Sequence, residues 1–535
     1  MASPSPKSPE QSDKSKKYDR QLRLWGDHGQ KLLEKSKICL INATALGTEI
    51  LKSLVLPGIG AFTIVDGEKV TEEDIGSNFF LEETSIGMPR AQAATQGLLE
   101  LNPDVRGDYI DESPEHVMAH TQDFFNNFTV VIATALPEKV LMPLSRQLWA
   151  TGVPLVVCRS IGFLGYVRLQ IKEHCVVEAH PDNEAPDLRL DKPWPALRTH
   201  LDKVDVSSLG TKERSHVPAL TILYYYMQKY KEMHGGSLPK TRSEKDELRK
   251  MIRTSLPPDG DTSGALEENY EQAVRFVNVC INSIGVSAQI QAILDDERCT
   301  NLTSESSSFW IICAALRELV QSEGSLPVRG SLPDMAADTT SYVTLQQLYQ
   351  RQAQLQAEAV YRRAVQIARS LGQSPDIISE AEVKLFCKHS SELYVLRGNC
   401  IADEYQNSSP NIAPYLEDPE SLMFYYVILR GLERFISEYN TYPGQFDDQV
   451  EPDVLKLKTL IGKLLSEWGC PTPVTSDDRV HEVCRYGGAE LHSVSAMLGG
   501  CTAHEVIKLI THQYKPINNT FIYDAITSTS ATFFL

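Results

Sequence analysis

The stretch KICLINATALGTEILKSLVLPGIGAFTIVD, residues 37–66, decides the fold of the first part of the chain. It reads as an apolar strand, a tight turn, a helix from about Gly47, a stop at Pro57-Gly58 and a second apolar strand that ends at Asp66. Two strands joined by one helix over this length form the β-α-β unit of nucleotide-binding folds. The sequence therefore predicts that a nucleotide-type sheet begins here.

The turn inside this unit, residues 42–47, lacks most of the glycines that a phosphate-binding turn needs. Glycines let the backbone approach a phosphate group, whose charge is then met by the amides at the start of the helix. Here only Gly47 is present, and a glycine at this place mainly allows the helix to pack closely on the strand. The Cβ atoms of Asn42, Thr44 and Ala45 restrict the positive φ angles and the close approach that glycine permits. We therefore expect that the chain keeps the scaffold of the β-α-β unit but has lost its phosphate-binding site.

The composition is that of a large globular protein with an acidic surface. A length of 535 residues suggests about three domains, and 42% hydrophobic with 23% charged residues is ordinary for such a protein. No apolar run approaches the roughly 20 residues that a membrane span needs. The formal net charge of -18 argues against a nucleic-acid partner, because binding phosphates requires an excess of Lys and Arg. An acidic surface suits association with a basic patch on another protein.

The N-terminal residues 1–17, MASPSPKSPEQSDKSKK, contain no apolar stretch of the kind found in secretory signals. Their Pro, Ser and Lys content predicts a disordered arm, and we expect cytoplasmic and nuclear localisation. The eleven cysteines are scattered singly, without His companions at metal spacing. Most are therefore expected to be reduced core thiols, and no metal site is predicted.

Strands and helices alternate through the first part of the chain. Apolar strands are predicted at residues 128–133 and 154–158, with a helix at 137–151 between them. Residues 166–172 alternate like an antiparallel strand. This order predicts an α/β fold with a Rossmann-like, doubly wound and mostly parallel sheet.

After residue 182, amphipathic helices follow one another to about residue 468. Near the end the α/β character returns, with a helix predicted at residues 491–514, broken or pinched at Gly499-Gly500, and a strand at 520–523. The sheet domain is therefore expected to be discontinuous in sequence. The expected divisions are an N-terminal arm (1–17), a first sheet segment (18–170), a mostly helical insertion (171–479) and a second sheet segment (480–535).

Four motifs occur in the order found in one known family, the adenylation domains of the enzymes that activate ubiquitin-like proteins. They are YDRQLRLWG at 18–26, GTEILKSLVLPGIG at 47–60, SIGMPRAQAA followed by LNPDV at 85–105, and LGGCTAHEVIK ahead of PINNTFIYD at 498–524. The chain resembles this family, because four ordered motifs are specific where one alone would be weak. The family pairs an active with an inactive adenylation half, and the inactive half can be a separate chain.

The resemblance implies that this chain is an inactive half. Where active members have glycines for ATP, the chain has Asn42, Thr44 and Ala45; Asp66-Gly67-Glu68 keeps a carboxylate on the ribose side, whereas Gly76-Ser77-Asn78 lacks the arginine of a phosphate-gripping motif. Arg90 falls where the family has a lysine, and Pro137 falls near the magnesium-binding aspartate. The resemblance thus implies no cofactor in this chain, and ATP with magnesium in a catalytic partner.

One functional position of the family is intact. In the Tyr-x-Arg-Gln motif, here Tyr18, Arg20 and Gln21, the family's arginine reaches across the dimer into the partner's ATP site and stabilises phosphate charge. The resemblance therefore implies that Arg20 acts in trans, with Tyr18, Gln21 and Trp25 beside it at the interface. From the residues alone, an ion pair between Arg20 and a surface carboxylate is the favoured interpretation.

The length and the long helical insertion favour the non-catalytic, regulatory subunit of a two-chain activating enzyme. The implied partners are a catalytic subunit, a ubiquitin-like modifier, a conjugating enzyme and the cytoplasmic tail of a membrane protein. Two alternatives stay open: an independent adenylating enzyme with unusual phosphate contacts, and an adaptor that binds through the helical insertion. Cys299 has acidic neighbours and Cys470 has no local His or Lys, so neither thiol matches a thioester-forming nucleophile well.

Overall fold

The structure is a computed structural model that describes residues 16–121, 123–181, 186–255, 264–278, 285–405, 412–470 and 477–535. One part of the chain is built around an eight-stranded mixed sheet. In spatial order the strands are β10 (Thr529–Phe533), β9 (Thr520–Asp524), β6 (Leu164–Gln170), β5 (Leu155–Ile161), β4 (Val130–Thr134), β1 (Lys37–Ile41), β2 (Ala61–Val65) and β3 (Arg106–Ile110). The strands from β5 to β3 run parallel, whereas β6, β9 and β10 are antiparallel, so the predicted doubly wound α/β fold is confirmed.

Strand β1 lies inside the parallel part of the sheet, between β2 and β4. It pairs with β2 in register from Lys37–Ala61 to Ile41–Val65, and its last four residues are buried. All residues of β4 and β5 are buried as well. Parallel strands covered on both faces read as continuous apolar runs, which explains why these strands were recognisable in the sequence.

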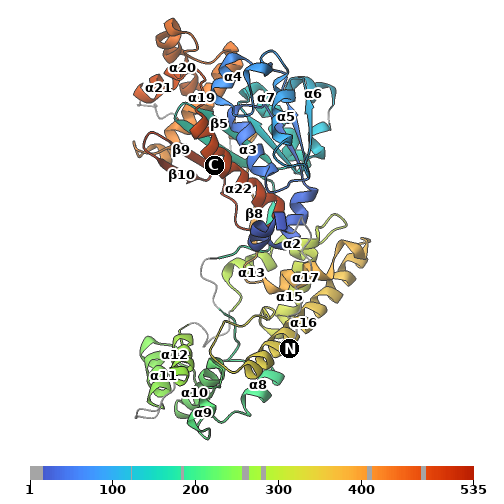
Figure 1. The fold of residues 1–535 in the computed structure, drawn as a ribbon, viewed down its shortest axis with the longest axis vertical. Coiled ribbons are helices and arrows are strands. Elements are labelled where there is room, and N and C mark those ends of the chain that lie inside the picture. The colour runs from blue at the N-terminus through green and yellow to red at the C-terminus, as the bar shows by residue number, and fades with distance from the viewer. Residues whose placement is uncertain are drawn as a thin grey trace, which may run out of the picture. The chain divides into compact units, whose positions relative to one another are not determined.

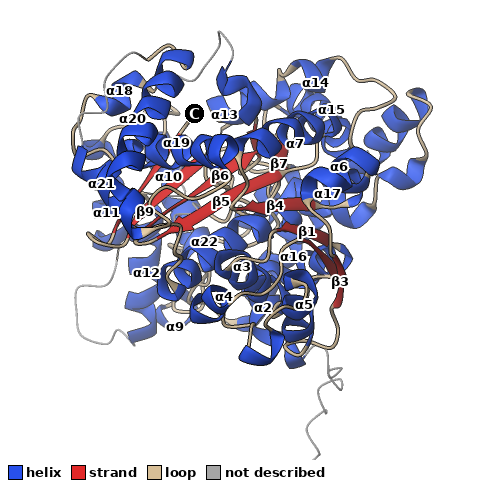
Figure 2. Ribbon diagram, turned by 90° about the horizontal axis from the view of Figure 1, so that it is seen from above, coloured by secondary structure: helices blue, strands red, loops and turns tan. Residues whose placement is uncertain are grey.

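Helices cover both faces of this sheet (Figure 2). On one face α3 (Ala45–Val55) and α22 (His492–Thr511) pack on each other, although they come from opposite ends of the chain (Figure 1). On the other face lie α7 (Glu138–Thr151) and α19 (Met423–Tyr439). The other helices that belong to the same part of the chain as the sheet are α2 (Asp19–Lys35), α4 (Glu72–Ser77), α5 (Arg90–Leu99), α6 (Pro114–His120), α18 (Ala413–Leu416), α20 (Val450–Glu467) and α21 (Asp477–Arg485).

Helix α22 is continuous, so of the two predicted alternatives at Gly499-Gly500, a break or a pinch, the break is wrong. Gly499 faces α3, and a Cβ atom built on it would lie 2.8 Å from the Cβ atom of Glu49, which is too close for real atoms. A Cβ atom built on Gly500 would have no neighbour within 4 Å among the described atoms. Gly499 therefore sets the distance between the two helices and does not end α22.

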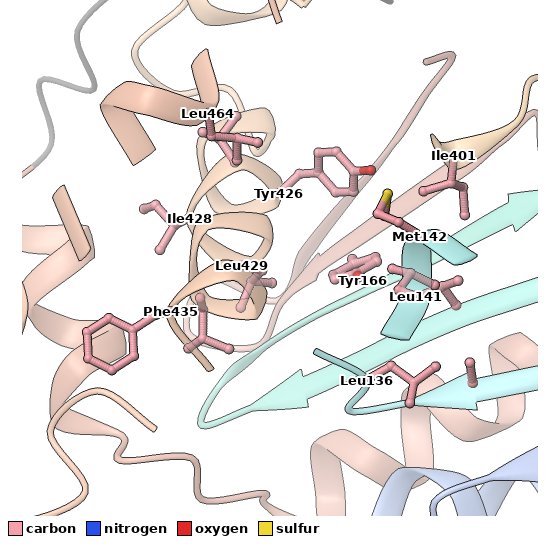
Figure 3. Packing of buried hydrophobic residues seen from close by; sticks show 14 of the residues in the cluster. Leu136, Leu141, Met142, Tyr166, Ile401, Tyr426, Ile428, Leu429, Phe435 and Leu464 are labelled. Carbon is pink, nitrogen blue, oxygen red and sulfur yellow. The ribbon is translucent and has the colours of Figure 1, made fainter. Parts of the chain in front are cut away.

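An apolar core fills the space between the sheet and α19. Leu141 and Met142 of α7 gather around Tyr166 of β6, together with Tyr426 and Leu429 of α19 (Figure 3). All five side chains are buried. Burying large apolar side chains is the main favourable term in folding, so this core holds α7 and α19 on the sheet.

The same face also buries five charged side chains. Glu433 pairs with Arg430 at 3.0 Å and with Arg159 at 3.4 Å, while Glu404 pairs with Arg430 at 2.6 Å and with Arg168 at 3.1 Å. Each of the five residues is at most 2% exposed. Charges are tolerated in an interior only when they are paired, so these contacts fix α19 against β5 and β6.

The chain divides into two compact units, and the division differs from the predicted boundaries. One unit is the chain up to Val176 together with Val395–Leu535, and the other is Val177–Tyr394. The helices after residue 395 were expected in the insertion (171–479), but α19 and α20 pack beneath the sheet. An amphipathic pattern does not reveal which core its apolar face joins. Of the predicted arm, residues 1–15 lie outside the described residues.

The unit Val177–Tyr394 is helical. Helix α10 contributes more side chains than any other helix to one apolar core of this unit, and α8, α11, α12 and α16 contribute the other helical members. Its helices are α8 (Pro195–Leu201), α9 (Thr211–Arg214), α10 (Ala219–Met233), α11 (Arg242–Thr254), α12 (Gly264–Phe276), α13 (Ala288–Leu294), α14 (Glu297–Thr300), α15 (Ser308–Glu323), α16 (Thr339–Ser370) and α17 (Glu380–Lys388).

A small second sheet pairs β7 (His174–Val176) with β8 (Tyr394–Leu396). Among the described residues, no helix has the length and apolar content of a membrane span.

The spacing of α3 and α22 can be tested with neighbouring glycines. We expect Gly499→Ala to destabilise the fold by about 1–3 kcal/mol, because the added methyl group meets Glu49. Gly500→Ala is the matched control and should stabilise the helix by about 0.5–1 kcal/mol, because alanine loses less backbone entropy. The midpoints of thermal unfolding measure both effects, and equal midpoints for the two variants would contradict the packing role of Gly499.

Candidate functional site

The turn after β1 is tied to the end of β4. Asn42 adopts a φ of 66°, although the sequence predicts that its Cβ atom restricts this left-handed region. Asparagine tolerates this region better than other residues with a side chain. Its Nδ2 atom donates to the carbonyl of Thr134 at 2.9 Å, and the Thr134 hydroxyl donates to the Asn42 carbonyl at 2.7 Å. These two bonds hold the turn in a shape that glycine supplies in other nucleotide folds.

The amides at the start of α3 are bonded within the chain itself. The Gly47 N–H donates to the hydroxyl of Thr44 at 3.2 Å, and the Ala45 N–H donates to the carboxyl group of Glu490 at 2.8 Å. A helix N-terminus is the place where such folds bind a phosphate group. The carboxyl group of Glu490 thus takes the position of a phosphate acceptor.

Gly47 has the packing role that the sequence predicts. A Cβ atom built on it would lie 2.8 Å from the Asn42 carbonyl oxygen and 3.1 Å from the Leu40 side chain. The absence of a side chain therefore lets α3 lie directly against β1.

Glu490 is positioned by the hairpin between β5 and β6. Gly162 in that hairpin donates its N–H to the carbonyl of Ala489 at 2.7 Å, which places the next residue beside α3. Burial raises the pKa of Glu490 from its ordinary value to about 7, although the bonds from the Ala45 and Leu46 amides oppose this shift. Sequence reasoning missed Glu490, because it lies 445 positions from Ala45 and no local pattern distinguishes it from other acidic residues.

Asp66 is the centre of a second set of contacts. Its carboxylate receives a fork from Arg90, with Nε at 2.7 Å and Nη2 at 3.2 Å, and it also accepts the N–H groups of Ala43 at 2.8 Å and Glu68 at 2.9 Å. Arg90 also reaches Asp74, 3.2 Å away. Asp66 follows the last residue of β2, and both of its oxygen atoms already have donors.

Two further positions, Asn78 and Pro137, correspond to the family's phosphate-binding and magnesium-binding residues. Asn78 is buried, donates to the Ala43 carbonyl at 3.1 Å and accepts from the Thr48 hydroxyl at 3.0 Å. Pro137 precedes α7 as its N-cap and carries no side-chain oxygen for a metal. Within the described part of the chain, no group of three or more His, Cys, Asp or Glu side chains is arranged to hold a metal ion.

Arg20 lies elsewhere, on helix α2, before a kink at Gly26. Its side chain is exposed and makes no hydrogen bond or ion pair with any residue that the structure describes. The neighbouring Arg23 pairs with Asp19 at 3.2 Å, so α2 carries one paired and one unpaired guanidinium. The expected alternative, an intrachain ion pair of Arg20, is therefore absent within the described residues.

Tyr18 lies differently from its expected place at an interface. It is 2% exposed, and its hydroxyl donates to Asp104 at 3.1 Å and accepts from Asn102 at 3.0 Å. Tyr18 therefore anchors the start of α2 to its own chain. Trp25 is half-buried and donates to Gln30 at 3.0 Å, and Gln21 is half-buried, so their contact with a partner stays a prediction.

Both cysteines considered as nucleophiles are buried. Cys299 and Cys470 are each 3% exposed. Burial, together with the nearby Asp295 and Asp296, raises the pKa of Cys299 to about 11, which leaves the thiol protonated at neutral pH. Cys470 belongs to the apolar core beneath the sheet. Both positions fit structural cysteines better than carriers of a thioester.

The raised pKa of Glu490 predicts a pH dependence of stability. Between pH 4.5 and 7 the carboxyl group is ionised in the unfolded chain but protonated in the folded one, so stability falls as pH rises through this window. Glu490→Gln removes this loss, and relative to wild type its unfolding free energy should gain about 2–3 kcal/mol from pH 5 to pH 8.

Thermal unfolding at the two pH values measures this gain. Glu490→Ala is the comparison variant: it also lacks the titrating group, so it should change relative to wild type as Glu490→Gln does, but it leaves the Ala45 amide without an acceptor and should be about 1–3 kcal/mol less stable than Glu490→Gln at both pH values. A constant difference between wild type and Glu490→Gln from pH 5 to pH 8 would contradict the burial of the carboxyl group.

Comparisons with known proteins agree with this geometry. The ThiF family model matches residues 18–534. The chain is similar to the NEDD8-activating enzyme E1 regulatory subunits of Danio rerio (47% identity, covering 98% of this chain and 99% of that protein) and Drosophila melanogaster (49%, 99% and 99%). It is also similar to the NEDD8-activating enzyme E1 regulatory subunit AXR1 of Arabidopsis thaliana (38%, 95% and 94%). The chain belongs to the ThiF family and, within it, to the family of NEDD8-activating enzyme E1 regulatory subunits.

Proposed function

We propose that this chain is the non-catalytic subunit of a two-chain enzyme that activates the ubiquitin-like protein NEDD8 in the neddylation pathway. The catalytic subunit binds ATP and magnesium, adenylates the modifier and forms the thioester, from which a conjugating enzyme receives the modifier. The observation that supports this most directly is the carboxyl group of Glu490, which occupies the start of α3 where a nucleotide phosphate would bind. The names of the relatives support the same assignment.

Arg20 is the residue through which this chain contributes to catalysis in its partner. Its guanidinium is exposed and unpaired among the described residues, and a guanidinium is the group best suited to phosphate oxygens. The segment that carries it is held firmly, because Tyr18 bonds to Asn102 and Asp104 and Lys17 bonds to Asp104 at 2.8 Å. A fixed backbone under a free cationic side chain is the arrangement that an arginine acting in trans requires.

An independent adenylating enzyme fits the site less well. Such an enzyme would need free amides at the start of α3, and these donate to Thr44 and Glu490 instead. The adaptor function is compatible with the main proposal, since the helical unit Val177–Tyr394 has a core of its own.

We predict that Arg20→Ala leaves the two-chain complex intact but slows adenylation by the partner about tenfold or more at subsaturating ATP. The reason is that a charge-assisted bond to a phosphate contributes about 1.5–3 kcal/mol. Exchange of labelled pyrophosphate into ATP measures the rate, and size-exclusion chromatography measures the complex.

Arg23→Ala is the matched control for this variant. It removes the same charge from the same helix, but Arg23 pairs with Asp19. Its exchange rate should equal that of the unmodified complex. An unchanged rate for Arg20→Ala, or equal losses for both variants, would show that Arg20 does not act on the partner's ATP.

A further inference from the structure

The helical unit contains an open hollow lined almost entirely by charged side chains. It has a volume of about 460 Å³ and is lined by Lys240, Arg242, Lys245, Asp246, Arg249 and Asn278. Four of these six residues are cationic, in a protein with 70 acidic and 52 basic side chains. Nothing in the proposed activating function uses this place.

Helix α11 provides most of this lining on one of its faces. Arg242, Lys245 and Arg249 are separated by three and four residues, the spacing that brings side chains to one side of a helix. Leu248 and Ile252 on the same helix are fully buried in the apolar core of the unit. Burial of this apolar face fixes the orientation of α11, so its cations are held over the hollow. From Arg242 to Arg249 the helix rises about 10 Å.

Two carboxylates near the hollow, Glu244 and Glu271, do not neutralise these cations. Glu244 accepts the backbone N–H groups of Lys240 at 2.7 Å and Thr241 at 2.8 Å, so it caps the helix. Glu271 is paired with Arg253 at 2.9 Å.

Only one cation of the lining has a partner within the described part of the chain. Arg249 bonds to Asp246 and Asn278, whereas the side chains of Lys240, Arg242 and Lys245 make no hydrogen bond or ion pair there. Like charges held this close repel one another, and the repulsion is relieved when an anion binds among them.

We propose that this hollow binds a compact anion that carries several phosphate groups. Guanidinium and ammonium groups together suit phosphate oxygens, because arginine offers paired donors and lysine a concentrated charge. A ligand whose charges lie within about 10 Å of one another can reach the whole row of cations at once. Asp246 and Asn278 hold the Arg249 side chain in place beforehand, which reduces the entropy that binding must overcome.

Calorimetric titration of the full-length chain with sodium tripolyphosphate tests this site. We expect binding that weakens as salt is added, and at least a tenfold loss of affinity in the double variant Arg242→Gln with Lys245→Gln. Lys250→Gln is the matched control: Lys250 is an exposed cation of the same helix that does not line the hollow, and its loss should leave the affinity unchanged. Circular dichroism checks that each variant is folded.

If the double variant does not fold, Lys240→Gln takes its place, because Lys240 is exposed and precedes the helix. It should weaken tripolyphosphate binding by a factor of several. The proposal is overturned if the unmodified chain does not bind tripolyphosphate, or if Lys250→Gln loses as much affinity as the lining variants. Tighter binding of a hexaglutamate peptide than of tripolyphosphate would also overturn it, because the site would then recognise acidic protein segments.

Discussion

The bond between the Ala45 amide and the carboxyl group of Glu490 is the contact on which this account of the protein depends. A helix that begins inside a fold needs acceptors for its first amides, and in a nucleotide-binding fold the phosphate groups of the ligand serve that purpose. Here the chain supplies the acceptors itself, from Glu490 and from Thr44. A residue near the end of the sequence thereby closes the turn near its beginning, and the turn keeps its shape without a ligand. Packing of α22 on α3 at Gly499 fastens the same two parts of the chain.

Two arginine side chains, Arg90 and Arg20, differ in whether they are paired within the chain. Arg90 is neutralised by Asp66 and Asp74, so the cation at the position of the family's lysine is committed to its own chain. Arg20 is the opposite case, because its guanidinium is exposed on a helix whose start is anchored through Tyr18. Arg90 therefore makes contacts within the chain where a nucleotide fold would contact its ligand. The exposed guanidinium of Arg20 is available to another molecule. This division suits a subunit that assists catalysis without binding the nucleotide.

Sequence patterns predicted those features that depend on neighbouring residues. The β-α-β unit and the packing role of Gly47 each follow from a short segment, and the structure confirms them. The pattern did not predict what depends on distant contacts: the acceptor at Glu490, the burial of Tyr18, or the packing of α19 beneath the sheet. Helical periodicity identifies an apolar face but not the core that receives it, which is why the helical unit ends at Tyr394 and not at the predicted residue 479. The positive φ of Asn42 shows that one side-chain amide and a threonine partner can replace a glycine.

The stoichiometry of nucleotide binding tests the central claim most directly. Equilibrium dialysis with labelled ATP and magnesium can be applied to this chain alone and to its complex with the catalytic subunit. Because Glu490 fills the start of α3, the isolated chain should bind no ATP, and the complex should bind one ATP for its two chains. Saturable binding to the isolated chain, or two equivalents of ATP per complex, would contradict the claim that the chain's own carboxyl group occupies the phosphate position.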